Sequence, residues 1–192
     1  MWYPEVFEKY NVVSVHQLLK QYIEEGRIKL DKSIHKELTT VHDPCNYGRK
    51  GMKTFGQAFF EEPRWITQQC CENYVEMHPN RMNNFCCGAG GGAWAMPYDA
   101  ERIYYGRVKA KQIMDTKAKM VIAPCHNCRD QIMKGLTKEY GLVGLETKYL
   151  WELVADSLVV EPWNEEEVQK ANELRDAQYE RDEIDLDAEQ DW

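Results

Sequence analysis

Five of the seven cysteines in this chain form one spaced pattern. Cys45 stands alone, Cys86 and Cys87 are adjacent and precede a glycine-rich run, and Cys125 and Cys128 form a C-x-x-C motif. Two adjacent thiolates cannot both reach one tetrahedral ion without distorting the peptide between them, so structural zinc sites place two to four residues between paired cysteines. Several thiolates beside glycine or proline turns suit iron and sulfide better than disulfide bridges or a single zinc ion. The pattern therefore predicts a metal-cluster site.

A glycine-rich run directly follows the adjacent cysteines. Gly88 to Ala93 match the dinucleotide-binding fingerprint G-x-G-x-x-A at the expected start of a helix, which would make a phosphate cradle. That fingerprint needs an acidic residue about 20 residues further on, near the end of the next strand. The next expected strand ends instead in Ala123-Pro124-Cys125. We therefore expect Gly88, Gly90 and Gly91 to be cofactor-binding glycines, which let backbone N–H groups approach a sulfur atom and leave room for a substrate.

The C-x-x-C motif admits a second explanation. A pair such as Cys125 and Cys128 at the start of a helix has a lowered thiol pKa and can shuttle between dithiol and disulfide without a metal. This explanation leaves three cysteines of the pattern without a role. Cys70 and Cys71 form another adjacent pair, but they lie in a helical stretch without a turn and are expected to be buried structural residues.

Three charged or titratable residues flank the cysteines of the pattern. His42 and His126 can each donate a hydrogen bond to sulfur or a proton to a leaving thiolate, and Arg49 can hold an anionic group of a substrate. Each histidine can equally have a structural role. These three are the candidate catalytic residues.

The cysteines need a scaffold that brings distant parts of the chain together. Short apolar runs alternate with helical patterns, which predicts an α/β fold, a mainly parallel sheet with helices on both faces. Ligands of such sheets bind beyond the carboxyl ends of the strands. We expect the cysteine site there, because each cysteine or pair of the pattern follows an expected strand. The expected strands are residues 12–15, 38–42, 74–77, 82–85, 120–123 and 145–148.

The helices between these strands are predicted from apolar spacing. One follows residue 15 and stops at Gly26, and another covers residues 54–71 with a break or restart at Pro63. Asp99 is expected to cap a helix, and further helices follow Asn127 and the last strand. The apolar face of the helix after Asp99 is expected to comprise Ile103, Val108 or Ala110, Ile113 and Met114.

Charge divides the chain into two expected parts. The net charge is -8, but residues 161–192 hold 13 acidic and 3 basic residues, which leaves the first 160 residues slightly basic. We expect one domain over residues 1–160 and an acidic, helical or disordered tail over residues 161–192. The absence of a basic stripe argues against nucleic acid as a partner. No apolar run reaches the roughly 18 residues of a membrane span, and no signal peptide is expected. We therefore predict that the protein is cytoplasmic and that its cysteines are reduced.

The motifs His42-Asp43-Pro44-Cys45, Cys86-Cys87-Gly88 and Pro124-Cys125-x-x-Cys128 resemble a known family. They are similar to the CCG domain, the cysteine-rich module of heterodisulfide reductases of the B/D type and related oxidoreductases. Within that family, the run from Cys125 to Gln131 most resembles the catalytic iron–sulfur subunit of the membrane complex associated with dissimilatory sulfite reductase. The resemblance covers about residues 1–160.

The resemblance implies a fold, a cofactor and an activity. The fold is Rossmann-like, and the implied cofactor is a non-cubane [4Fe–4S] cluster with Cys45, Cys86, Cys87, Cys125 and Cys128 as metal ligands. The implied reaction is reductive cleavage of a disulfide or trisulfide, on a thiol substrate or on a small sulfur-carrier protein. An iron that can hold the first thiolate would avoid a free thiyl radical, because a disulfide needs two electrons and clusters usually deliver one at a time.

The chain also differs from the usual pattern of that family. Its members usually carry a ferredoxin-like C-x₂-C-x₂-C-x₃-C segment and often a second cysteine-rich copy, and this sequence has neither. We therefore expect part of a longer protein, or one subunit that receives electrons from iron–sulfur or membrane subunits. The alternatives are a metal-binding module that only supports assembly and a metal-free C-x-x-C dithiol oxidoreductase.

Overall fold

The computed structural model describes residues 8–10, 12–90 and 92–182. The chain divides into two compact units, Met1–Val159 and Val160–Trp192. The first unit contains the sheet and all seven cysteines, and the second contains one long helix. None of the helices in the described part is long and apolar enough to cross a membrane.

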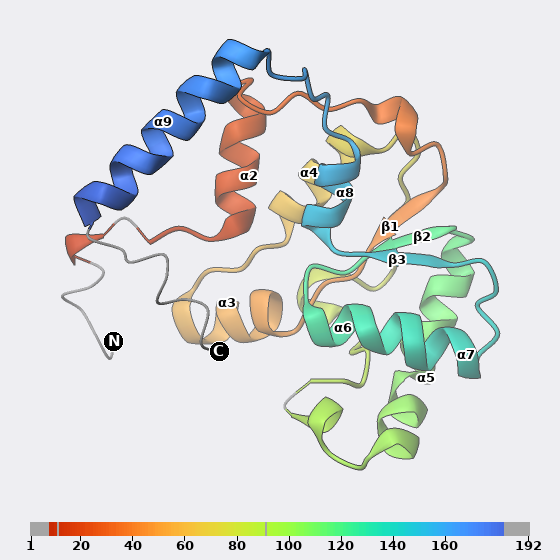
Figure 1. Ribbon diagram of the computed structural model, residues 1–192. Helices are drawn as coiled ribbons and strands as arrows, with labels where there is room; N and C mark the ends of the chain where they lie inside the picture. Colours follow the sequence, from red (N-terminus) through yellow and green to blue (C-terminus); the bar gives the residue numbers. More distant parts are fainter. Residues whose placement is uncertain (1–7, 11, 91, 183–192) are drawn as a thin grey trace. The chain divides into compact units, whose positions relative to one another are not determined.

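Three short parallel strands form the sheet of the first unit (Figure 1). They are β1 (Thr39–Val41), β2 (Met120–Ile122) and β3 (Glu146–Lys148), and they lie in the order β1-β2-β3. Thr40 pairs with Val121, and Val121 pairs with Thr147. The predicted α/β fold with a parallel sheet is confirmed.

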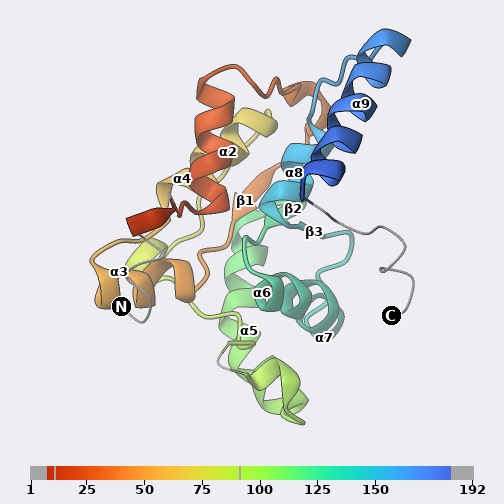
Figure 2. The ribbon, with the colours of Figure 1, turned by 60° about the vertical axis from the view of Figure 1, so that its left-hand side comes forward.

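Helices cover both faces of this sheet (Figures 1 and 2). In both views α4 and α8 lie on one side of the strands, and α5, α6 and α7 lie on the other. The helices of this unit include α2 (Val15–Glu24), α3 (Gly51–Phe55), α4 (Glu61–Cys70), α5 (Asp99–Thr116), α6 (His126–Asp130), α7 (Thr137–Glu139) and α8 (Leu150–Asp156). Shorter 3₁₀ turns cover Lys32–Ile34, Arg81–Asn83 and Ala93–Ala95, and π-helical turns cover Asn46–Lys50 and Gln131–Leu136.

The side chains of β2 alternate between two apolar clusters. Val121 and the following Ala123 pack with residues of α5 and of the π-helical turn after α6. Met120 and Ile122 pack with residues of α4 and α8. Successive side chains of a strand point to opposite faces, so a strand buried on both faces is apolar throughout. This explains why every residue from Met120 to Ala123 is apolar.

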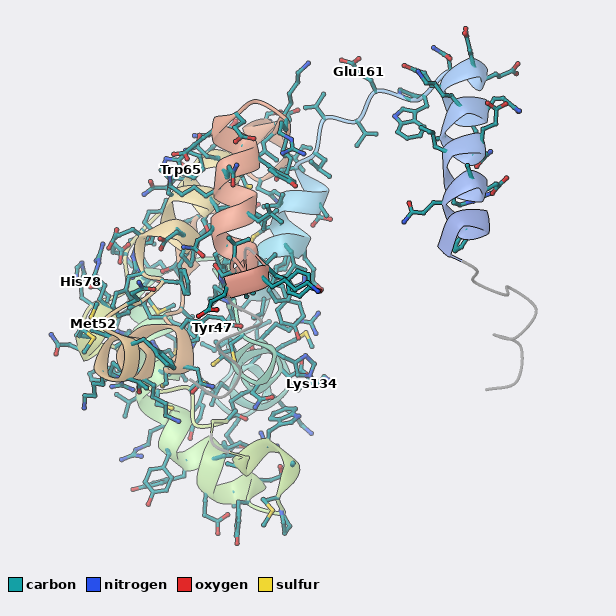
Figure 3. All side chains as sticks on the ribbon, turned by 90° about the vertical axis from the view of Figure 1, so that its left-hand side faces the viewer. Tyr47, Met52, Trp65, His78, Lys134 and Glu161 are labelled. Atoms are coloured by element: carbon teal, nitrogen blue, oxygen red, sulfur yellow. The ribbon has the colours of Figure 1, made fainter. Side chains whose placement is uncertain are left out.

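Helix α2 packs on the turn after Cys45 and on α4 through contacts with aromatic rings. The ring of His16 meets the ring of Tyr47 edge-on at 5.1 Å between centroids, and Nζ of Lys20 lies 4.9 Å from the centroid of the Trp65 ring in α4. Figure 3 labels both aromatic residues. Tyr47 lies beside the first turn of α2, and Trp65 of α4 lies beside a later turn of α2. Tyr47 belongs to the π-helical turn that follows Cys45, so α2 supports the backbone of that turn.

The strand expected at residues 12–15 is wrong. Val15 is instead the first residue of α2, because Ser14 and Gln17 form a capping box. The side chain of Ser14 accepts a hydrogen bond from the N–H of Gln17 at 3.2 Å, and the side chain of Gln17 accepts one from the N–H of Ser14 at 3.1 Å. This reciprocal cap satisfies two free donors of the first helical turn, which outweighs the strand propensity of the valines.

The helical region expected at residues 54–71 is divided earlier than predicted. Helix α3 ends at Phe55, where Gly56 adopts a left-handed conformation with φ of 68°. Helix α4 begins at Glu61, so Pro63 lies in its first turn, where a missing N–H costs nothing. At residue 99 the difference is one position, since Asp99 is the first helical residue of α5 and Tyr98 precedes it.

A buried ion pair fixes the chain where it leaves β1. The carboxylate of Asp43 accepts two hydrogen bonds from the Arg64 guanidinium, at 2.6 and 2.8 Å, and both side chains are 4% exposed. Arg64 also donates to both oxygens of Glu76, at 2.6 and 3.1 Å, and to the carbonyl of Phe60. Burial alone would raise the pKa of Asp43, but the hydrogen bonds and positive charge of the Arg64 guanidinium lower it. This network connects α4, the end of β1 and residue 76.

The second unit is dominated by α9 (Glu165–Asp182). Asn164 precedes this helix and exchanges two hydrogen bonds of 2.9 Å with Glu167, which forms another capping box. Apolar side chains of the unit, such as Trp163 and Leu174, are mostly exposed. Residues 183–192 of the expected acidic tail lie outside the described residues.

We predict that Arg64→Met lowers the free energy of unfolding by about 3–5 kcal/mol, because it leaves the buried Asp43 carboxylate without its cation. The measurement is urea unfolding followed by tryptophan fluorescence. The matched control is Arg81→Met, which removes a partly exposed pair with Glu61 and is expected to cost less than about 1 kcal/mol. If the two variants lost the same free energy of unfolding, the buried pair would not stabilise the fold more than the partly exposed one.

Candidate metal centre

Two of the three cysteine segments come from neighbouring parallel strands. Val41 at the end of β1 pairs with Ile122 at the end of β2, so both strands finish at the same edge of the sheet. The N–H of His42 donates to the carbonyl of Ile122 at 2.9 Å, which keeps the two exits together. Cys45 and Cys125 follow these exits within a few residues. This part of the predicted arrangement at the strand carboxyl ends agrees with the structure.

The third segment reaches the site by a different route from the one expected. Residues 82–85 are not a strand: a 3₁₀ turn occupies Arg81–Asn83, and the expected strand at residues 74–77 forms only one isolated bridge, between Tyr74 and Thr39. Side chains hold this segment in place of sheet hydrogen bonds. The N–H of Arg81 donates to Asp43 at 2.7 Å, and the amide of Asn84 donates to the carbonyl of Asp43. The Cys86-Cys87 pair is therefore positioned by Asp43, not by a strand.

All five cysteines of the pattern line one pocket of about 420 Å³. Cys87 and Cys128 are buried, Cys45 and Cys125 are partly buried, and Cys86 is exposed. The sulfur atoms thus run from a closed floor to an open mouth. The remaining lining residues are Asn46, Lys50, Gly88, Gly90, Tyr105 and Asn127.

The thiols contact one another and nearby donors. The Sγ atoms of Cys87 and Cys128 lie 3.3 Å apart, and the N–H of Gly88 donates to the Sγ of Cys86 at 3.3 Å. Nη2 of Arg49 lies 3.2 Å from the Sγ of Cys45, while Nη1 donates to the carbonyl of Asn84 at 2.9 Å. Arg49 therefore connects the Cys45 turn to the segment that carries the adjacent cysteines.

These contacts divide the thiols into proton donors and acceptors. Hydrogen bonds from Cys128 and Cys86 hold the pKa of Cys87 well below its ordinary value. A hydrogen bond from Cys128, with backbone N–H groups, lowers the pKa of Cys125 to about 6 in spite of burial. The Cys128 thiol donates to both Cys125 and Cys87, which raises its own pKa. A hydrogen bond from the Cys45 thiol to Cys86, together with burial, raises the pKa of Cys45. Cys87 and Cys125 therefore form thiolates more readily than free cysteines, and a thiolate is the form that binds a metal.

His42 is fully buried beside the pocket floor and has no hydrogen-bond partner in the described residues on either ring nitrogen. Its ligand atom lies within 4.8 Å of the sulfur atoms of Cys87 and Cys128, and burial lowers its pKa well below the ordinary value. An unpaired buried polar group carries a desolvation cost of a few kcal/mol. A group that binds these two thiolates would lie within reach of the ring, so the residues present fit a metal or cluster.

Two glycines let α5 approach the adjacent cysteines closely. Gly88 has φ of 95°, and a Cβ there would lie 2.2 Å from the carbonyl oxygen of Arg102. A Cβ at Gly106 would lie 2.6 Å from the carbonyl oxygen of Cys87. A Cβ at Gly90 would meet nothing within 4 Å, and Gly91 lies outside the described residues.

The dinucleotide fingerprint does not open a long helix. The glycine run is followed only by the 3₁₀ turn Ala93–Ala95, and α5 begins at Asp99. A phosphate cradle uses the N-terminus of a helix that starts directly after the glycines. The described residues lack that feature, which agrees with the preference for a sulfur site.

The remaining candidates lie at different depths. His126 is mostly exposed; its Nδ1 shares a hydrogen bond with the hydroxyl of Tyr149, and its Nε2 lies 4.0 Å from Asp130. Cys70 and Cys71 are buried in the apolar cluster between the sheet, α4 and α8, and they do not line the pocket.

Sequence reasoning missed the polar interior behind the pocket. The apolar face expected for α5 is only partly correct, because Ala110 and Ile113 are buried while Val108 and Met114 are exposed. Lys109 and Gln112 are buried instead, and Lys109 is fully so. No local pattern marks this lysine as buried, since Asn84 and Met77, which contact its Nζ, are distant in sequence. Lys50 and Tyr105, which line the pocket, were also not identified.

The cysteine-bearing part of the chain matches a known family. Residues 39–133 match the family model of a cysteine-rich domain, CCG. This match contains all five cysteines of the pattern and begins in β1. The resemblance to the CCG domain that the cysteine motifs predicted is confirmed.

Curated relatives include parts of larger enzymes. The chain is 34% identical over 128 residues to a subunit of the dihydromethanophenazine:CoB–CoM heterodisulfide reductase of Methanosarcina acetivorans, covering 66% of the chain and 29% of the relative. It is 28% identical over 170 residues to the Hdr-like menaquinol oxidoreductase iron-sulfur subunit 2 of Archaeoglobus fulgidus, which covers 85% of the chain and 29% of the relative. It is 26% identical over 140 residues to the EtfAB:quinone oxidoreductase of Syntrophomonas wolfei, which covers 70% of the chain and 19% of the relative. The chain thus spans less than a third of the length of these relatives.

We predict that Cys125, which is only partly buried whereas Cys87 is buried, is an early-titrating thiol that a reagent can reach in the reduced, metal-free protein. Because its pKa is lowered to about 6, its alkylation rate by iodoacetamide should rise through pH 6 and level off near neutrality. Cys45, whose pKa is raised, is the internal control and should still be gaining reactivity at pH 9. Peptide mapping by mass spectrometry gives both rates. A Cys125 rate that still climbs steeply between pH 8 and 9 would contradict the assignment.

Proposed function

We propose that this chain, which contains a cysteine-rich CCG domain and is homologous to a heterodisulfide reductase subunit, is an iron–sulfur electron-transfer part of a larger oxidoreductase. The observation that carries the proposal is the gathering of five thiols from three distant segments in one pocket. Relatives named as iron–sulfur subunits support the same class of function.

The proposed cofactor is a non-cubane [4Fe–4S] cluster. Its proposed ligands are Cys45, Cys86, Cys87, Cys125 and Cys128, because thiolates are the usual ligands of such clusters. Adjacent Cys86 and Cys87 suit two different irons better than one ion. The unpaired ring of His42 can donate a hydrogen bond to a cluster sulfur, and the backbone of Gly88 and Gly90 can approach it.

The proposed reaction is reductive cleavage of a disulfide or trisulfide, which consumes two electrons and two protons for each sulfur–sulfur bond. A bound cluster would supply the electrons one at a time together with an iron able to hold a thiolate. Exposed Cys86 and the open space beside Gly90 leave the pocket mouth accessible to a substrate. Lys50 lines the pocket and can attract an anionic sulfur, and exposed His126 can provide a proton. Arg49 is engaged with Cys45, so its proposed role is to position that thiolate.

One observation favours a second candidate function. The lowered pKa of Cys125 beside Cys128 is also typical of a dithiol that exchanges with disulfides without a metal. That function would need only the C-x-x-C pair. It would persist after Cys45 is replaced, whereas the cluster function would not.

Partners follow from the need for electrons. We propose electron-donating iron–sulfur or membrane subunits on one side, and a thiol substrate or a small disulfide-bearing or trisulfide-bearing carrier protein of sulfite or sulfate reduction on the other. The proposed location is the cytoplasm, with membrane association through partner subunits. Relatives named as menaquinol or quinone oxidoreductases support such an arrangement.

We predict that the anaerobically reconstituted protein binds about four irons and four sulfides, as expected for one [4Fe–4S] cluster. Cys87→Ala and Cys125→Ala should lose or rearrange the cluster, because each removes a proposed ligand. The measurements are iron, zinc and sulfide analysis with an EPR spectrum.

Cys70→Ala and Cys71→Ala are the matched controls. Each removes a buried sulfur outside the pocket, so each should keep the iron and cost at most a few kcal/mol of stability. Stoichiometric zinc without sulfide in the parent protein would favour a structural metal module. Equal iron loss in both pairs of variants would show that the ligand set is wrong.

We also predict that deletion of residues 165–192 leaves the cluster spectrum unchanged and weakens binding of an electron-donating partner. This segment lies in a separate compact unit and is strongly acidic, so it can gain Coulomb attraction from a basic partner. Binding of the full chain, measured by calorimetry, should therefore weaken with added salt. Iron loss on deletion would place the segment in the core, and unchanged binding would leave it only a solubilising role.

A further inference from the structure

Lys109 is the most unusual side chain behind the cysteine pocket. It lies on α5, is fully buried, and is among the largest fully buried side chains of the described residues. Its Nζ donates to Oδ1 of Asn84 at 2.7 Å and to Oε1 of Gln112, and it lies 3.7 Å from Sδ of Met77. Its hydrogen bonds are therefore made to neutral groups.

Among the described residues, no carboxylate compensates this charge by direct contact. Within the described part of the chain, no Asp or Glu oxygen forms an ion pair with Lys109. The nearest candidate by electrostatics, Asp43, is already bound in two places by Arg64. A buried cation without an anion is costly, since an isolated ammonium in a protein interior loses several kcal/mol of solvation. Its negative partner must lie elsewhere.

The sulfur atoms of the pocket are the remaining source of negative charge. Burial lowers the pKa of Lys109 to about 8, while negative charge on Asp43 and on the sulfur atoms of Cys87, Cys128 and Cys45 raises it. Two structural connections place the lysine beside the floor. Asn84, its hydrogen-bond acceptor, lies two residues before Cys86, and Gly106, one turn earlier on α5, packs against the carbonyl of Cys87.

We propose that Lys109 is the internal countercharge of the metal centre: its buried ammonium balances the negative charge on the thiolate-bound cluster and raises the reduction potential of that cluster. This inference rests on the cluster proposed above, and it assigns Lys109 a positioning role without contact to substrate. Adding an electron makes the cluster more negative, so a nearby cation stabilises the reduced state more than the oxidised one. The effect is large in a buried site, because charges are weakly screened there. Net charge around a cluster is one of the factors that set its potential.

The test compares variants of the full chain that differ in charge at one position. Lys109→Met removes both the charge and the hydrogen bonds, Lys109→Gln removes the charge but keeps a donor, and Lys109→Arg keeps both. The control is Lys111→Met on the same helix, because Lys111 is exposed and pairs with Asp115 at the surface. Each protein is reconstituted with iron and sulfide, its iron is counted, and its potential is measured by EPR-monitored redox titration.

The expected result follows charge. Lys109→Met and Lys109→Gln should keep the iron, while the equilibrium constant for one-electron reduction falls at least tenfold, a shift of about 59 mV to more negative potential. Lys109→Arg and Lys111→Met should match the parent protein. If Lys109→Met fails to fold, the comparison of Lys109→Gln with Lys109→Arg answers the same question, because both side chains donate hydrogen bonds.

Two results would overturn the inference in distinguishable ways. Iron-loaded Lys109→Gln with the potential of the parent protein would show that Lys109 acts only as a polar support, and the proposed cluster would stand. A parent protein that binds no iron and sulfide would overturn the proposed function and this inference together.

Discussion

The carboxylate of Asp43 is the constraint on which the cysteine site depends. It receives two hydrogen bonds from Arg64 of α4 and one from the backbone of Arg81, while its own carbonyl receives one from Asn84. These contacts bring the exit of β1 and the segment before Cys86 to the same place. A buried ion pair adds little net stability, but it disfavours every arrangement in which one partner is left alone. Its main effect is therefore to specify one position for the site.

Several elements of the site were predictable because the signal is local. The apolar run from Met120 to Ala123 followed by proline and cysteine indicated a buried strand that ends at a ligand, and β2 is such a strand. The same reasoning found β1 and β3. Here the residues that determine the structure lie within the segment itself, so periodicity and turn residues are sufficient.

The errors occur where distant side chains determine the local structure. Residues 82–85 look like a strand, but Asp43 accepts hydrogen bonds from the backbone N–H of Arg81 and from the side-chain amide of Asn84, which hold the segment in a tighter path. The burial of Lys109 depends on Asn84, which is distant in sequence and accepts a hydrogen bond from its Nζ, and a hydrophobic pattern does not reveal this contact. The cysteine spacing was informative in spite of this, because five thiols of one type limit the possible chemistry more than they limit the fold.

The close approach of α5 to the cysteine pair has a consequence for how sequences of this kind can diverge. Gly88 faces the backbone of Arg102, and Gly106 faces the backbone of Cys87, so helix and loop meet backbone to backbone. A side chain at either glycine would push the two segments apart, and a change at one position cannot be repaired at the other. The two positions therefore have to remain glycine together. A search pattern that adds the helical glycine to the five cysteines would separate chains that share this pocket floor from chains that share only the cysteine spacing.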